Sequence, residues 1–454
     1  MISSYSPQRP DDLVVEAPET TAAVVGSMFT DARAAQLAWS AGPAAARSTA
    51  LSAAADAVEA DHDGLVELVV REVGKPLAEA RGEVTRSVAI LRYYAQQVFD
   101  PVGAMHEPSG AGLLFTRRRP LGVAGLITPW NFPLAIPLWK AAPALAFGNA
   151  VVIKPAPEAT ACALRLAQLI APFLPDDVLT VAPGRAETGQ AVLAEADVVS
   201  FTGSTGAGRA VSQAAAERGV PVQAEMGGQN PSVVLPDADI EAAAGQIAGA
   251  AMAFAGQKCT ATKRVVVVGD PTAFRDALVA AVEKMQLGDP AGAGTIVGPV
   301  IDETARTRVL DAASDAERAG GRLVTGRPSL DRDGWFVRPT VVEGVPGDHP
   351  LAREEVFGPI CLLQTAADLD EAVDIANAVP HGLAAALYTR DLSSSLEAAD
   401  RLQAGLVKVN APTSGVDFYL PFGGEKASSH GPREQGKVAQ DFYTSLHTVT
   451  IAPA

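Results

Sequence analysis

The chain has 454 residues, which is too long for one compact core, so two or three domains are expected. Its 52 acidic and 36 basic residues give a formal net charge of −16, which disfavours nucleic acid and anionic membranes as partners. Prolines, glycines and charges interrupt every apolar run, and the N-terminus lacks a signal-peptide pattern, so no membrane span is expected. Three cysteines are too few for a disulfide framework and fit a reducing compartment, which indicates a cytoplasmic protein.

The first hundred residues are predicted to be mainly helical. Residues 22–69 are rich in alanine, and residues 78–100 have apolar positions three and four apart. Residues 113–121 differ, because they read as extended and exposed and contain three consecutive basic residues. The tail at 444–451 alternates well enough to be a strand, and an isolated terminal strand needs a sheet to join. Pairing with residues 113–119, or with another subunit, would satisfy its backbone groups.

Between these segments, strands and helices alternate regularly. The first series predicts strands at 122–128, 150–153, 178–181, 198–201 and 222–224. A second α/β series follows Pro231, with strands near Val233, Val265, Cys361, Leu387 and Val407. This alternation predicts an α/β fold with parallel, doubly wound sheets, and the continuous apolar strands fit sheets that are covered on both faces.

A glycine-rich turn follows the strand that ends at Phe201. Residues 202–208 read Thr-Gly-Ser-Thr-Gly-Ala-Gly and open a helix. Small residues let the backbone approach a pyrophosphate, and a helix N-terminus offers unpaired N–H groups to it. The spacing departs from the usual G-x-G-x-x-G, so this motif alone fits an ordinary turn as well as a dinucleotide site.

Polar residues follow two other predicted strands. Asn131 comes after the first strand, within Thr-Pro-Trp-Asn-Phe-Pro, and its amide could bond an oxyanion or simply cap the next helix. Lys154 ends the next strand and could bind a ribose or phosphate, although a strand-terminal lysine is often only solvated. Open α/β sheets bind ligands at the carboxyl ends of their strands, which makes both residues candidates for one site.

A cysteine and a glutamate suggest covalent chemistry. Cys259 lies among small and polar residues in segment 254–262, and Glu225 stands before a Gly-Gly turn. Such a thiol can be a nucleophile, and such a carboxylate can be a base that activates water. Cys162 and Cys361 are predicted to be buried core residues. No two histidines have metal-ligand spacing, so no catalytic metal is expected.

Taken together, these segments resemble the aldehyde dehydrogenase superfamily over nearly the whole chain. Seven segments stand in the family's order and spacing: Pro-Trp-Asn-Phe-Pro at 129–133, Lys-Pro-Ala at 154–156, Phe-Thr-Gly-Ser at 201–204, Glu-Met-Gly-Gly at 225–228, Gly-Gln-Lys-Cys at 256–259, Glu-Val-Phe-Gly-Pro at 355–359 and Pro-Phe-Gly-Gly at 421–424. The resemblance implies a Rossmann-type NAD(P)-binding domain (1–100 and 121–226), an α/β catalytic domain (227–435) and a small β oligomerisation element (101–120 and 436–454).

The resemblance also implies a reaction, the NAD(P)-dependent oxidation of an aldehyde to a carboxylic acid. Cys259 would attack the aldehyde as a thiolate, and its backbone N–H and the Asn131 side chain would hold the oxyanion. Hydride transfer to the nicotinamide would leave a thioester, which water activated by Glu225 would hydrolyse. Members of the family form homodimers or homotetramers, and the same is expected here.

For the cofactor, the resemblance implies contacts to its adenosine, ribose, pyrophosphate and nicotinamide groups from Thr128, Pro129, Trp130, Lys154, Ala156, Gly203, Ser204, Glu355 and Phe357. In many NAD-preferring members, a glutamate three residues after the lysine accepts the 2′-hydroxyl of the adenosine ribose. Here Pro157 occupies that position and is followed by Glu158. A 2′-phosphate is then not repelled, so the sequence predicts NADP use or dual use of NADP and NAD.

Three segments, at 136–140, 410–417 and 428–436, look like the α-ketoglutarate semialdehyde dehydrogenase branch. They imply a small polar or carboxylated aldehyde as substrate. One alternative is a CoA-acylating semialdehyde dehydrogenase, but such enzymes typically lack the glutamate, so Glu225 favours hydrolysis. A second alternative is a non-enzymatic binding protein on the same fold, which would be expected to lack at least one of the three catalytic candidates.

Overall fold

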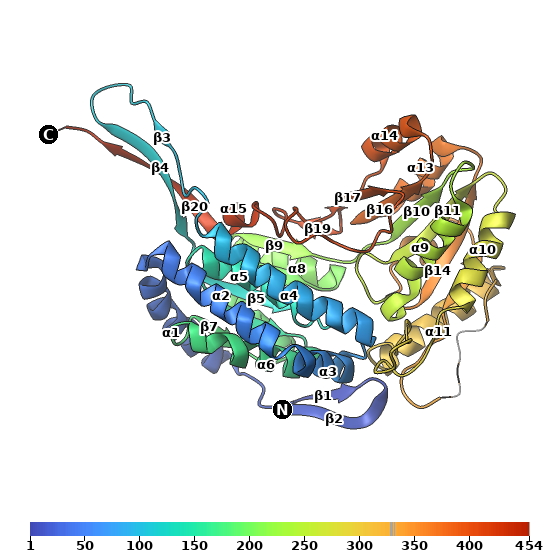
Figure 1. Cartoon of the computed structure of the whole chain (residues 1–454), viewed down its shortest axis with the longest axis horizontal. Coiled ribbons are helices and arrows are strands. Elements are labelled where there is room, and N and C mark those ends of the chain that lie inside the picture. The colour runs from blue at the N-terminus through green and yellow to red at the C-terminus, as the bar shows by residue number, and fades with distance from the viewer. Residues whose placement is uncertain (327–329, 331, 454) are drawn as a thin grey trace.

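The computed structural model describes residues 1–326, 330 and 332–453. Residues 327–329 and 331 of the predicted catalytic domain, and Ala454 of the predicted oligomerisation element, lie outside the described residues. Figure 1 shows two α/β lobes, a narrow strand arm that projects from the first lobe, and a hairpin at the N-terminus. Within the described part of the chain, no helix combines the length and the hydropathy needed to cross a bilayer.

The N-terminal part of the first lobe is helical, as predicted. Its helices are α1 (Ala22–Ala41), α2 (Ala44–Ala60), α3 (His62–Val73) and α4 (Leu77–Gln97). Helix α3 ends where Gly74 adopts a left-handed φ of 66°, and α4 begins directly after Pro76, so turn residues separate the two helices. An antiparallel hairpin that the sequence analysis did not identify precedes them, with strands β1 (Ile2–Ser6) and β2 (Arg9–Ala17).

The sheet of the first lobe has the strand order β19-β9-β8-β5-β6-β7. All five predicted strands are confirmed as parallel neighbours: β5 (Val123–Thr128), β6 (Ala150–Pro155), β7 (Leu179–Val181), β8 (Val198–Thr202) and β9 (Val222–Glu225). The connecting helices are α5 (Ala135–Ala146), α6 (Thr160–Ile170), α7 (Ala186–Glu195) and α8 (Thr205–Glu217). The antiparallel edge strand β19 (Ser429–His430) comes from near the C-terminus and was not predicted.

The sheet of the second lobe has the order β12-β13-β14-β11-β10-β16-β17 and is parallel except at β12. Its strands are β10 (Asn230–Val234), β11 (Thr262–Val268), β12 (Arg322–Leu323), β13 (Thr340–Glu343), β14 (Ile360–Ala366), β16 (Ala384–Tyr388) and β17 (Leu406–Val409). The helical segments are α9 (Ile240–Met252), η3 (Ala253–Gly256), α10 (Thr272–Glu283), α11 (Glu303–Arg318), α12 (Pro350–Arg353), α13 (Leu369–Asn377) and α14 (Leu392–Arg401). The five predicted strands are confirmed, whereas β12 and β13 were missed.

The projecting arm is a three-stranded sheet with the order β20-β4-β3 (Figure 1). Its strands are β3 (Met105–His106), β4 (Leu113–Pro120) and β20 (Thr444–Ile451). Strands β4 and β20 pair along their full length, from Leu113 opposite Ile451 to Pro120 opposite Thr444. The predicted pairing of the tail with the basic segment is therefore confirmed.

Four strand ends line up along one edge of the first sheet. Thr128 pairs with Pro155, and Thr202 pairs with Glu225, at the carboxyl ends of their parallel strands. Because ligands of open α/β sheets bind at this edge, the turns that follow these strands are where a site is expected.

Candidate active site

The turns after β5 and β8 carry predicted site residues of the first lobe. Strand β5 is followed by Trp130 and Asn131, and β8 is followed by Gly203 and Ser204. The Ser204 hydroxyl accepts the N–H of Ala207 at 3.4 Å and so caps helix α8. The first N–H groups of a helix have no partners inside the helix, so this turn can bind an anionic group.

The loop that carries Cys259 belongs to the second lobe and lies between η3 and β11. Residues 254–256 have left-handed φ values of 54°, 52° and 64°, which turn the chain sharply before the cysteine. Asn230 donates its side-chain N–H groups to the carbonyl oxygens of Cys259 at 2.7 Å and Ala261 at 2.8 Å. Asn230 therefore fixes the main chain of this loop, a role that the sequence analysis did not assign.

Cys259 lies where two cavities meet. The first, which we call the cleft cavity, has a volume of about 720 Å3 and lies between the lobes. Its lining includes Pro129, Trp130, Asn131, Gly203, Ser204, Cys259, Glu355 and Phe357. The second, which we call the α4 cavity, has a volume of about 450 Å3 and is lined by α4, the loop at 412–422 and Cys259. Ligands held in the two cavities would therefore meet at this cysteine.

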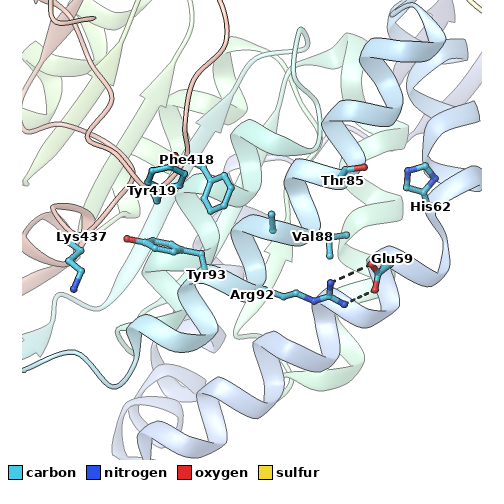
Figure 2. Close-up of a pocket in the computed structure, with 10 residues that line it drawn as sticks. Glu59, His62, Thr85, Val88, Arg92, Tyr93, Phe418, Tyr419 and Lys437 are labelled. Carbon is cyan, nitrogen blue, oxygen red and sulfur yellow. Dashed lines mark hydrogen bonds and ion pairs between the residues drawn. The ribbon is translucent and has the colours of Figure 1, made fainter.

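A third hollow, of about 860 Å3, lies on the outer face of α4 (Figure 2). We call it the outer groove, and it is lined by Glu59, His62, Thr85, Val88, Ala89, Arg92, Tyr93, Phe418, Tyr419 and Lys437. No predicted catalytic or cofactor residue lines it. Its greater volume therefore does not make it the candidate active site.

Glu225 is the last residue of β9 and is only 2% exposed. Its Oε2 accepts the hydroxyl of Ser429, in β19, at 2.5 Å, and its Oε1 has no hydrogen-bond partner among the described residues. Burial and then the charge of Glu434 raise the pKa of Glu225 well above its usual value, whereas the Ser429 hydrogen bond lowers it. A carboxyl group with a raised pKa and one unpartnered oxygen is suited to general-base chemistry.

The surroundings of the Cys259 thiol favour its protonated form. Burial, followed by the charges of Glu355 and Glu225, raises the pKa of the thiol to about 12. Nucleophilic attack therefore requires that its proton be removed. Asn131 lines the same cavity, and its Nδ2 donates to the Gln257 carbonyl at 3.0 Å. An amide nitrogen carries two N–H groups, so the second can serve a developing oxyanion.

A buried polar cluster that the sequence analysis did not identify acts on Glu225. Lys140, in the apolar helix α5, donates from Nζ to the Ser200 hydroxyl at 2.9 Å and to the Glu434 carboxylate. The charges of Lys140 and Glu434 shift the pKa of Glu225 in opposite directions. A lysine in an apolar helix is a sequence signal for a buried partner, but the partner itself lies far along the chain.

The cleft cavity fits a dinucleotide. A Cβ at Gly203 would lie 2.6 Å from the Phe201 ring, and a Cβ at Gly227 would lie 2.1 Å from Oε2 of Glu355, so a side chain at either position would displace its neighbour. Oε1 of Glu355 has no hydrogen-bond partner in the described part of the chain, which leaves it able to accept from a ligand hydroxyl. Burial raises the pKa of Glu355 to about 7, a shift that Lys263 opposes. Small residues and an unpartnered carboxyl oxygen are what ribose and pyrophosphate groups require.

Three of the predicted cofactor residues do not line the cleft cavity: Thr128, Lys154 and Ala156. The Ala156 N–H donates to the Thr128 carbonyl at 2.9 Å, which joins the ends of β5 and β6. Lys154 is 7% exposed, makes no hydrogen bond or ion pair with the described residues, and has a pKa that burial lowers. The charge of Glu158 acts on Lys154, and burial raises the pKa of Glu158. A buried, unpartnered lysine beside a carboxyl group fits a polar ligand such as a ribose.

The aldehyde dehydrogenase family model matches residues 1–449. This chain belongs to the aldehyde dehydrogenase family. It is an NAD(P)-dependent dehydrogenase that oxidises an aldehyde to a carboxylic acid. In the described ranges of this dehydrogenase, no three His, Cys, Asp or Glu residues are grouped so that they could hold a metal ion.

Named relatives and solved structures agree with this assignment. The α-ketoglutaric semialdehyde dehydrogenase of Bacillus subtilis (strain 168) is 39% identical, over 100% of this chain and 95% of the relative. The α-ketoglutarate semialdehyde dehydrogenase of Haloferax volcanii is 37% identical, over 98% and 94%. The crystal structure of an NAD-dependent aldehyde dehydrogenase from Sinorhizobium meliloti superposes with a TM-score of 0.96 at 34% identity, covering 100% of this dehydrogenase and 92% of that chain. The predicted α/β fold of this family is therefore confirmed.

Proposed function

We propose that this dehydrogenase acts on a small polar or carboxylated aldehyde, that is, on a semialdehyde. The observation that carries the proposed reaction is that Cys259 lines both the cleft cavity and the α4 cavity. A dinucleotide in the first cavity and an aldehyde in the second would bring the two reactants together at one sulfur. The names of the two semialdehyde dehydrogenases described above support the substrate class.

In the proposed first step, Cys259 is the nucleophile. Its Sγ adds to the aldehyde carbon, and the carbonyl oxygen becomes an oxyanion that Asn131 Nδ2 and the Cys259 N–H stabilise. The thiol proton passes through a water molecule to Oε1 of Glu225, because no hydrogen bond joins the sulfur to this oxygen directly, although the charge of Glu225 acts on Cys259. This transfer removes a negative charge that raises the pKa of the thiol, so it favours formation of the thiolate.

In the proposed second step, the thiohemiacetal carbon loses hydride and a thioester remains on Cys259. NAD(P) supplies the hydride acceptor when it is bound in the cleft cavity. After Glu225 has released its first proton to solvent, it takes a proton from water, and the resulting hydroxide adds to the thioester. The C–S bond then breaks, and the carboxylic acid leaves.

For the cofactor we propose dual use of NADP and NAD. Lys154 can attract a 2′-phosphate by its charge, and Pro157 supplies no carboxylate to repel it. The Glu158 carboxyl group, one residue later, acts on Lys154 and can accept a 2′-hydroxyl instead. The ratio of kcat/KM for the two cofactors tests this. A preference above about a hundredfold for NAD would contradict dual use.

We also propose the domain division and assembly expected from the sequence: a cofactor domain (1–100 and 121–226), a catalytic domain (227–435) and an oligomerisation element (101–120 and 436–454). The arm exposes apolar side chains at Met105, Leu113, Leu446 and Ile451, which supports its burial in a homodimer or homotetramer. Light scattering measures the mass, and a stable monomer would contradict this.

The three cysteines are free thiols, which fits a reducing compartment and supports a cytoplasmic location.

A panel of aldehydes, scored by formation of NADH or NADPH, tests the substrate proposal. It contains succinic and glutaric semialdehydes, their uncharged counterparts butanal and pentanal, and long aliphatic and aromatic aldehydes. A large preference for long aliphatic or aromatic aldehydes would refute the proposed substrate class. Product analysis with and without coenzyme A separates hydrolysis from acylation, and a coenzyme A requirement would refute the role of Glu225.

A further inference from the structure

The wall of the α4 cavity contains three charged residues of α4. Glu79, Glu83 and Arg86 are spaced three and four residues apart, which places them on one face of the helix. Glu79 accepts a hydrogen bond from Lys258 Nζ at 2.6 Å, and Glu83 is ion-paired with the buried Lys75. Arg86, which is partly buried, makes no hydrogen bond or ion pair with any residue that the structure describes. The wall therefore holds one guanidinium without a partner.

Glu83 is not available to Arg86. Besides its ion pair with Lys75, its Oε1 accepts the N–H of Leu134 at 2.9 Å and the N–H of Ala135 at 3.0 Å. These bonds hold the N-terminus of α5, where a carboxylate is favoured. Both oxygens of Glu83 are thus committed to structure, and its charge is cancelled by Lys75.

The remaining charges leave Arg86 uncompensated. Glu79 and Lys258 form a pair, and the charge of Arg86 acts on Glu79 only from a distance. The charge of Lys408 also acts within range of Arg86, and the opposite charge of Asp417 acts on Lys408. When Glu83 is counted with its buried partner Lys75, and Glu79 with Lys258, the positive charge of Arg86 is the one left over at the α4 cavity, in a chain whose formal net charge is −16. This charge is where a single anionic group of a ligand would be attracted.

The outer face of the same helix offers a direct contrast. Arg92, in the outer groove, donates to Asp56 at 3.0 Å and to Glu59 at 2.5 Å, as Figure 2 shows for Glu59. Arg92 thus has carboxylate partners from α2, whereas Arg86, in the cavity with Cys259, has none. A missing partner at the inner position is what a ligand carboxylate would supply.

The rest of the α4 cavity is largely apolar. Its lining includes Phe132, Ile136, Trp139, Val416 and Phe422. An apolar passage that contains a nucleophilic thiol and an unpartnered guanidinium matches a short methylene chain with a carbonyl at one end and a carboxylate at the other.

We propose that Arg86 binds the carboxylate of the substrate and thereby selects aldehydes with a carboxylate at the end away from the carbonyl; this rests on the proposed function above. A guanidinium holds a carboxylate through two parallel N–H···O bonds, which fix position as well as charge. Arg86 is thus a specificity-determining residue, and the chemistry at Cys259 does not depend on it.

The test compares glutaric semialdehyde with pentanal, which has the same chain length and no charge, at saturating cofactor. In the Arg86→Met variant, kcat/KM for glutaric semialdehyde should fall about 10- to 100-fold, because a charged hydrogen-bonded pair is lost. The value for pentanal should change less than about threefold. Arg86→Lys should restore part of the loss, since it returns the charge without the bidentate geometry.

Arg81→Met is the matched control, because Arg81 is an exposed arginine on the same helix and does not line the cavity. It should leave both kcat/KM values unchanged. A second readout is binding of glutarate, measured by calorimetry in the catalytically dead Cys259→Ala protein. Adding Arg86→Met to that protein should weaken glutarate binding by about tenfold or more.

The outcomes separate the two proposals. If the unaltered enzyme does not favour glutaric semialdehyde over pentanal, the proposed substrate class is wrong. The proposed role of Arg86 is then contradicted as well. If the unaltered enzyme shows the preference but Arg86→Met keeps it, only the Arg86 assignment is wrong. An equal loss for both aldehydes, with unchanged glutarate binding, would show that Arg86 is merely structural.

Discussion

The two cavities that meet at Cys259 are built differently. The cleft cavity is formed where parallel strands end, with glycines such as Gly203 and Gly227, at which a side chain would meet Phe201 or Glu355. The α4 cavity is formed by long side chains of a helix and by the loop at 412–422. A point substitution replaces a side chain but leaves the main-chain groups in place. The same fold can therefore keep its cofactor site while the aldehyde site is altered.

The largest expected effect comes from the residue that the two cavities share. Cys259→Ala should lower kcat by about 10⁴-fold or more, because no other group forms the covalent intermediate. Binding of NADH, measured by fluorescence, should change less than about twofold, because the glycine turns remain. Cys361→Ala, at a buried cysteine in β14, serves as a thiol control and should stay active. Residual turnover close to that of the unaltered enzyme would mean that the nucleophile is wrongly assigned.

A smaller effect is expected from the base. Glu225→Gln should slow thioester hydrolysis by about 10² to 10⁴-fold, the usual contribution of a general base. If attack remains possible, rapid mixing should show a burst of NADH followed by slow turnover. Glu187→Gln, at an exposed position of α7, is the control. Slow turnover without a burst would place the defect before hydride transfer instead.

The preference between NADP and NAD can be altered without a change at the aldehyde site. Glu158→Gln should raise the ratio of kcat/KM for NADP to that for NAD by about tenfold, because a negative charge near Lys154 is removed. KM for the aldehyde should not change, since Glu158 does not line the α4 cavity. An unchanged ratio would show that this carboxyl group does not contact the 2′ position.

The smallest expected effect is a shift in the pH dependence of kcat. Glu225 acts as a base only when deprotonated, so kcat should rise as the pH passes through its raised pKa. Ser429→Ala removes a hydrogen bond that lowers this pKa, so the rising limb should move about one unit to higher pH, with the alkaline plateau unchanged. Ser393→Ala, at an exposed site on α14, is the control. A pH profile that stays in place would mean that another group titrates.

The residues near the cofactor site could be predicted from the sequence more easily than those near the aldehyde site. Asn131, Lys154 and Gly203 each stand at or just after the end of an apolar strand, so a local pattern places them at the carboxyl edge of a parallel sheet. No local sequence pattern of this kind identifies Ser429 or Arg86. Ser429 matters because β19 pairs with β9, and Arg86 matters because the carboxylates near it are already bound. Both facts depend on segments that are remote in sequence.

The same reason explains which elements were missed. Strands β12 and β19 have two residues each, which is too short for any periodicity to be read. Strand β2 begins with Arg9, Pro10, Asp11 and Asp12, and its apolar run is limited to residues 13–15. The valine run at 265–268 of β11 allowed that strand to be found, and such a run is expected where both faces of the sheet are covered.

Strand β19 also sets the order in which the enzyme can be completed. Glu225 is synthesised before the second lobe, whereas Ser429, which bonds it, emerges from the ribosome almost last. The tail strand β20, which pairs with β4, follows later still. A nascent or proteolysed polypeptide that stops before residue 425 therefore contains Cys259 and Glu225 but lacks the edge strand β19 and the Ser429 hydroxyl. The hydrogen bond from Ser429 to Glu225 can therefore form only when translation is nearly finished.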